Sequence, residues 1–184
     1  RGETQSASAP VGFAAIAVPA VRSRLWLAWN DRGLTHALWE DAGAAKPGEL
    51  PAATPEAELP TQFAALLTAY FAGAPVDPAS LPVDPSGTPF QLRVWAALRG
   101  IARGHVRSYA GIALGVGQVR AMRAVGMANS KNPIAVVIPC HRVVEKDRRL
   151  GGYTSGLDRK RYLLELEGVR VVGDVVQPGQ LTLI

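Results

Sequence analysis

Cysteine is almost absent from this chain of 184 residues, in which Cys140 is the only one. A single cysteine cannot form a disulfide within the chain and leaves no cysteine-rich zinc signature. The three histidines and the one cysteine also have spacings that make a poor metal site, so we expect no metal. A free thiol fits a reducing compartment, which predicts a cytoplasmic protein, or a nuclear one in a eukaryote.

Long apolar runs are also missing. No stretch approaches the ~20 uninterrupted apolar residues of a membrane-spanning helix, so we expect no membrane partner. The opening RGETQSASAP has no apolar signal core, and we interpret it as a frayed or trimmed terminus. With 48% hydrophobic and 19% charged residues, the chain can still bury a core in one large domain or two small ones.

The charge is unevenly distributed, although the net value is only +5. Residues 31–92 hold eight acids and two bases, whereas residues 93–149 hold eleven bases, nine of them arginine, and two acids. Such a basic segment indicates a polyanionic partner. A solvated surface in an arginine-rich proteome explains the same asymmetry equally well.

The first part of the chain has the pattern of a small sheet followed by a helix. Residues 11–39 form short β-like runs, and Asn30-Asp31-Arg32-Gly33 supplies turn chemistry between the second and third. Residues 42–60 resemble a loop, and residues 61–73 have helical spacing of apolar side chains. Repeated proline marks residues 75–88 as a linker.

The second part is mostly helical. A helix is predicted from Pro89 to Gly104, and a short helix over 108–117 precedes a second one over 118–129, which is a helix-turn-helix pattern. An extended segment is predicted over 134–144 and a closing helix over 157–168. The sequence therefore predicts an α+β fold with an N-terminal domain (1–74), a linker (75–88) and a C-terminal domain (89–184).

The single thiol lies in an unusual context, AVVIPCHRVV. Pro139 cannot donate to a sheet ladder, so we expect the backbone to leave the strand there and to let Cys140 and His141 share one site. A nearby base and the cation of Arg142 would lower the thiol pKa. The alternative is a buried small hydrophobe. A cysteine protease fits poorly, because its histidine normally comes from far along the chain.

Several motifs occur in one order over residues 88–168: TPFQLRVWAAL, SYAGIA, RAVGMANSKNP, IPCHRVV and GGYTSGLDRKRYLLELEG. Together they resemble the O6-alkylguanine-DNA alkyltransferases, also called methylated-DNA–protein-cysteine methyltransferases. The resemblance implies DNA repair by direct reversal, in which the protein takes an alkyl group from guanine O6 in one irreversible step. It implies no cofactor, because guanine itself is the leaving group. We expect a monomer on double-stranded DNA containing O6-alkylguanine and leave cooperative binding open.

The resemblance also implies catalytic roles. Cys140 would be the nucleophile, His141 would take its proton through a water, and Glu167 would orient His141. Asn132 would be the hinge between the helix-turn-helix and the active-site segment, and Tyr109 would donate to guanine N3 as the acid. Each has a plainer alternative: a core aromatic for Tyr109, a solvated helix end for Glu167 and a turn former for Asn132.

On the DNA side, the resemblance places the second helix in the minor groove, with Arg123 filling the gap left by a flipped nucleotide. The plainer alternative is one more surface arginine, since Arg120 lies three residues away. Small residues nearby would let the helix backbone approach DNA closely. The remaining predicted residues are Arg120, Tyr109, Ala121, Ala124, Gly126 and Arg142 for DNA binding, and Val143, Tyr153, Thr154 and Ala135 for the substrate pocket.

Two rival functions stay open. A non-catalytic alkylguanine-binding protein would lack the nucleophile that Cys140 supplies. A helix-turn-helix regulator with a redox-sensing thiol would leave Tyr109, Asn132 and Glu167 unexplained. The chain also departs from the human-type members of the family, because it has no cysteine for their structural zinc site.

Overall fold

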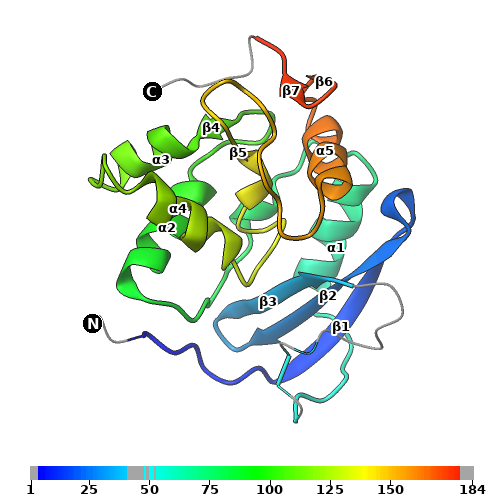
Figure 1. Ribbon diagram of the computed structural model, residues 1–184. Coiled ribbons are helices and arrows are strands. Elements are labelled where there is room, and N and C mark those ends of the chain that lie inside the picture. The colour runs from blue at the N-terminus through cyan, green and yellow to red at the C-terminus, as the bar shows by residue number, and fades with distance from the viewer. Residues whose placement is uncertain (1–3, 41–47, 49, 52, 179–184) are drawn as a thin grey trace. The chain divides into compact units, whose positions relative to one another are not determined.

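The computed structural model describes residues 4–40, 48, 50–51 and 53–178 (Figure 1). The chain forms two compact units, one of residues 1–88 with 133–137 and one of residues 89–132 with 138–184. A small antiparallel sheet with one helix occupies the first unit and most helices belong to the second, so the predicted α+β class is confirmed. The predicted domain limits at residues 74 and 89 stay a prediction.

The sheet of the first unit has the antiparallel order β1 (Gly12–Val18), β2 (Ser23–Asn30), β3 (Gly33–Trp39). The predicted turn chemistry joins the last two strands, because the Asn30 side-chain oxygen accepts the backbone N–H groups of Arg32 (2.9 Å) and Gly33 (3.1 Å). Gly33 has φ +149°, and a Cβ there would lie 2.5 Å from the carbonyl of Pro82. Only glycine fits this position without displacing the backbone.

Helix α1 (Thr61–Phe71) buries Phe63, Leu67 and Tyr70 at the predicted spacing. Two other segments of this unit pair with the free edge of β3, which would otherwise expose unpaired backbone groups. The Leu34 N–H donates to the carbonyl of Pro82 (3.0 Å), and the Ala37 N–H donates to that of Pro133 (2.9 Å). Residues 75–88 and 133–137 are therefore held against the sheet.

The second unit contains the predicted helix-turn-helix. Helices α3 (Tyr109–Gly115) and α4 (Met122–Ser130) pack on each other and on α2 (Pro89–Arg99) (Figure 1). The indole N–H of Trp95 on α2 donates to the carbonyl of Ala128 on α4 at 2.8 Å, and Ser108 caps α3 by accepting the N–H of Gly111 at 3.0 Å. The elements are α2 (Pro89–Arg99), β4 (Arg107–Ser108), α3 (Tyr109–Gly115), α4 (Met122–Ser130), β5 (Val143–Val144), α5 (Leu157–Leu166), β6 (Val171–Val172) and β7 (Val175–Val176).

The start of α4 corrects one prediction. The helix begins at Met122, so Arg120 and Ala121 precede it instead of lying within it. A turn accounts for the difference, since the Ala121 N–H donates to the carbonyl of Gln118 at 2.7 Å. No helix among the described residues is both long and apolar enough to span a membrane.

The predicted extended segment over 134–144 is wrong for most of its length. Ile134 makes a single bridge to Ala37, and the chain then turns at Val136, which has φ +73°. A short 3-10 helix, η3 (Cys140–Arg142), follows, and only Val143–Val144 forms a strand. The run of β-branched residues misled the prediction, because β propensity reflects packing on a half-buried surface rather than a fixed backbone preference.

Candidate active site

Cys140 is the first residue of η3, directly after Pro139. Its N–H donates to the carbonyl of Ile138 at 2.8 Å, and the Arg142 N–H donates to that of Pro139 at 3.0 Å. The backbone therefore bends at Pro139 as predicted, but into a helical turn. Cys140 is 6% exposed, and both residues that follow it are buried.

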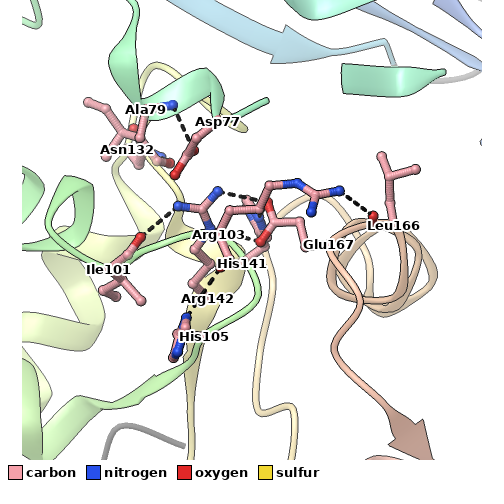
Figure 2. Close-up of polar contacts among 11 residues, drawn as sticks. Asp77, Ala79, Ile101, Arg103, His105, Asn132, His141, Arg142, Leu166 and Glu167 are labelled. Carbon is pink, nitrogen blue, oxygen red and sulfur yellow. Dashed lines mark hydrogen bonds and ion pairs between the residues drawn. The ribbon is translucent and has the colours of Figure 1, made fainter. Parts of the chain in front are cut away.

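Glu167 is the centre of a buried polar cluster, shown in Figure 2. It directly follows α5, and its Oε1 lies 2.9 Å from His141 Nε2. Arg142 donates Nε to Oε2 and Nη2 to Oε1, each at 2.8 Å. Burial alone would raise the pKa of Glu167, but the charges and hydrogen bonds of His141 and Arg142 hold it well below its ordinary value. The group is a carboxylate.

The state of His141 follows from this cluster. Burial lowers the pKa of His141, so the imidazole is neutral near pH 7 although Glu167 favours the charged form. Because a carboxylate can only accept hydrogen bonds, the proton of neutral His141 resides on Nε2. Its Nδ1 then carries a lone pair and has no partner among the described residues. His141 is therefore held as a base with Nδ1 available.

Arg142 does not lie on a DNA-facing surface, which corrects its predicted role. The side chain is fully buried, and its Nη1 donates to the carbonyl of Ile101 at 2.6 Å while Nε and Nη2 bind Glu167. Figure 2 shows this guanidinium between Ile101 and Glu167. A charge that is enclosed and paired in this way cannot contact phosphates, so Arg142 stabilises the site from behind.

The thiol itself also departs from expectation. Burial raises the pKa of Cys140, and the side chain of Asn132 together with the charge of Lys160 opposes that rise without overcoming it. The prediction that Arg142 lowers the thiol pKa is wrong, because Arg142 is not among the groups that affect it. Cys140 is therefore a protonated thiol in the resting protein, and it needs a base to become a nucleophile.

Asn132 connects the end of α4 with the active-site segment, because its Nδ2 donates to the carbonyl of Ile138 at 2.7 Å. It also hydrogen-bonds the Cys140 thiol. Thr154 is exposed and reaches the same helix end, donating its hydroxyl to the carbonyl of Ser130 at 3.3 Å. Their predicted roles as hinge and pocket residue stay predictions.

Lys160 is a residue of the site that sequence reasoning missed. It is fully buried on α5, and its Nζ donates to the carbonyls of Val143 (2.7 Å), Gly152 (3.4 Å) and Leu150. Burial lowers its pKa to about 8, and the negative charge of Glu145 opposes this. The ammonium joins β5 to the loop before Tyr153. Its position on the apolar face of α5, with Leu163 and Leu164, was a usable signal.

Tyr109 is the first residue of α3 and is partly buried. Burial, together with the negative charge of Glu145, raises the pKa of Tyr109 to about 12. The phenol therefore keeps its proton at physiological pH and can donate it.

The predicted DNA-binding residues other than Arg142 lie on or before α4. Arg120, Arg123 and Ala124 are exposed, whereas Ala121 and Gly126 are half-buried. The side chain of Arg123 makes no hydrogen bond or ion pair to any residue in the described part of the chain, so its guanidinium is available. Two predicted pocket residues are buried: Val143 in the second unit, and Ala135 in the segment that belongs to the first.

Comparison with known families identifies both parts of the chain. Residues 89–169 match the DNA-binding domain of 6-O-methylguanine DNA methyltransferase, and residues 23–85 match the ribonuclease-like domain of the same protein family. The chain belongs to the 6-O-methylguanine DNA methyltransferase family. The first match covers the motif region of residues 88–168 except for Thr88, and it includes the segment around Cys140.

Individual members of the family are similar to this chain over most of its length. The methylated-DNA–protein-cysteine methyltransferase of Methanosarcina barkeri is 46% identical over 142 residues, which are 77% of this chain and 88% of that protein. The crystal structure of Mycobacterium tuberculosis OGT in complex with DNA matches 89% of this chain and 97% of its own, with 39% identity and a TM-score of 0.74. A methyltransferase structure from Pyrococcus kodakaraensis matches 86% of this chain with 25% identity and a TM-score of 0.61.

Proposed function

We propose that this protein repairs O6-alkylguanine in double-stranded DNA by transferring the alkyl group to Cys140, once and irreversibly. The observation that carries the proposal is the buried thiol directly before His141, a neutral base. Its Nδ1 has no hydrogen-bond partner within the described part of the chain, and its Nε2 is fixed by Glu167. The family's named activity and the solved relative in complex with DNA support it.

The thiol is activated at the moment of reaction. His141 Nδ1 takes the proton of Cys140, directly or through one water, and the resulting imidazolium is stabilised by Glu167. The Cys140 sulfur then attacks the alkyl carbon. A sulfur–carbon bond forms while the carbon–O6 bond breaks, and the electron pair of that bond stays on guanine. Nothing converts the resulting thioether back to the thiol, so each molecule reacts once.

The departing guanine carries negative charge that a proton must neutralise. Tyr109 donates its hydroxyl proton to guanine N3 in this proposal, which makes guanine a better leaving group. The high pKa of Tyr109 keeps that proton on the phenol until negative charge develops on the base.

The DNA side of the proposal rests on α4. Because O6 of a paired guanine lies inside the duplex, the nucleotide must be swung out at a cost of a few kcal/mol. Arg123 is exposed and unengaged within the described residues, so it can enter the gap and stack on the orphaned base. Other arginines of the basic segment supply phosphate contacts that do not depend on sequence.

A redox-sensing thiol is the rival, and burial disfavours it. Redox-sensing cysteines are exposed thiolates, whereas Cys140 is 6% exposed with a raised pKa. The variant Cys140→Ser separates the two functions. It should still bind a duplex containing O6-methylguanine but release no methyl group, while the wild type removes one methyl per molecule and then stops. Repeated turnover by the wild type would contradict the proposal.

A further inference from the structure

The loop between α2 and β4, residues 100–106, packs against Glu167. Gly104 has φ +79°, and a Cβ built on it would lie 3.1 Å from the backbone carbonyl oxygen of Glu167. Three residues earlier, the carbonyl of Ile101 accepts a hydrogen bond from Arg142 Nη1 at 2.6 Å. The loop therefore contacts both the backbone of Glu167 and the cation that pairs with its carboxylate.

Arg103 links this loop to the end of α5. Its Nη2 donates to the carbonyl of Leu166, the last residue of the helix, at 2.8 Å, as Figure 2 shows. The last four carbonyls of a helix lack partners within the helix, so a side chain that binds one of them holds the final turn in place. The negative end of the helix dipole also lies here, which favours a cation at this position.

Glu167 depends on this helix end because it is the C-cap residue of α5. It directly follows Leu166, and Gly168 then turns the chain away with φ +85°. Helix ends fray readily, yet the carboxylate must keep its contacts with His141 at 2.9 Å and with Arg142 at 2.8 Å. A displacement of about 1 Å can slow a reaction about a hundredfold, so whatever holds the end of α5 also controls the reactive geometry.

We infer that Arg103 is a positioning residue for the proton transfer from Cys140. By holding the end of α5, it keeps the Glu167 carboxylate on His141 Nε2 and thereby keeps the imidazole oriented as a base. This inference rests on the proposed function and assigns Arg103 no contact with DNA or with the alkyl group. In the sequence Arg103 is one of nine arginines that suggested a polyanionic partner, but its guanidinium binds a helix end of the protein itself.

Reaction with the free O6-methylguanine base tests the inference without any contribution from DNA binding. The single-turnover rate of methyl transfer is measured over a range of base concentrations. Arg103→Met should lower the maximal rate about tenfold and leave the half-saturating concentration unchanged, because the substrate pocket stays intact while the catalytic base is misaligned. Arg103→Lys keeps a charged donor and should react within about threefold of the wild type. Arg170→Met, the matched control, removes an exposed cation three residues after Glu167 and should react at the wild-type rate.

A second background separates positioning from a general loss of structure. His141→Asn lacks the base, so adding Arg103→Met to it should cause no further slowing. Arg103→Gln stays polar but is too short to reach the helix end, and it should behave like Arg103→Met, so the test does not depend on the folding of one variant.

The hydrogen bond from His141 Nε2 to Glu167 gives a readout that needs no methyl transfer. Its proton should give a downfield NMR signal in the wild type, which Arg103→Met should broaden or remove. Equal slowing in both backgrounds, an unchanged NMR signal, or transfer by Arg103→Met at the wild-type rate would overturn the inference. If the wild type transfers no methyl group, the proposed function is wrong, and the NMR signal still shows whether Arg103 positions Glu167.

Discussion

Arg142 and Glu167 form a bidentate ion pair in which both side chains are fully buried, with Nε–Oε2 and Nη2–Oε1 distances of 2.8 Å. The same carboxylate also holds His141. Glu167, which directly follows α5, therefore positions both residues that follow Cys140. Removing one partner of such a pair leaves an uncompensated buried charge.

Glu167→Gln should therefore destabilise the protein by about 3 kcal/mol in urea unfolding, because Arg142 loses its counter-ion. Glu165→Gln is the matched control, since Glu165 lies on the same helix but is exposed. It should change the unfolding free energy by no more than about 0.5 kcal/mol. Equal stability of the two variants would show that the buried pair does not support the fold.

Stability should also fall as the solution is acidified. Because the folded pKa of His141 is lowered, the unfolded chain binds a proton at this residue below pH about 6.5 while the folded protein resists it. The free energy of unfolding should then decrease by up to about 1.4 kcal/mol per pH unit. Glu167, whose folded pKa is also lowered, adds a second loss below pH about 4.3.

The variant His141→Asn isolates the first of these two losses. Its stability should be nearly flat between pH about 6.5 and 5, when measured by urea unfolding at each pH. His105→Asn changes an exposed histidine and should keep the slope of the wild type. An unchanged slope in His141→Asn would mean that another group causes the pH dependence.

We expect the buried ammonium of Lys160 to contribute more to the free energy of unfolding than a single surface charge does. Lys160→Met leaves the carbonyls of Val143, Leu150 and Gly152 without their donor, and we expect a loss of about 3 kcal/mol in unfolding free energy. Arg161→Met removes the next cation on α5, whose partner Asp174 is largely exposed, and should cost under about 1 kcal/mol. A similar cost for both would argue against Lys160 as the anchor of this loop.

Arg123→Ala should slow repair of O6-methylguanine in a duplex much more than reaction with the free O6-methylguanine base, because only the duplex requires flipping. The two rates are compared by following methyl loss from each substrate. Arg120→Ala removes an equal charge just before α4 and should weaken DNA binding without this selective effect. Equal slowing on both substrates would count against a gap-filling role for Arg123.

Much of the fold could be predicted from local patterns. The three strands, the Asn30 turn, helix α1 and the helix-turn-helix all depend on nearby residues, and all were predicted from spacing and turn chemistry. The segment 134–138 was not, because its conformation depends on a bridge from Ile134 to Ala37, far away in the sequence. Val136 at positive φ has no signal in the sequence, since β-branched residues rarely adopt it.

The sequence named candidate residues for the site but could not predict their electrostatics. The motif indicated Cys140, His141 and Glu167, and the structure brings the last two together at 2.9 Å. The burial of Arg142 could not be read from its sequence neighbours, because its partners Ile101 and Glu167 lie 41 and 25 residues away. Without these contacts the arginine resembled one more DNA-binding cation. For the same reason, the sequence predicted a lowered thiol pKa where burial raises it.

The most direct test of the account is the mass of the peptide that carries Cys140 after incubation with a duplex containing O6-methylguanine. The account predicts that this peptide gains one methylene, in a one-to-one ratio with the guanine restored, and that no other residue is modified. An intact protein that binds the duplex and leaves Cys140 unmodified would contradict it.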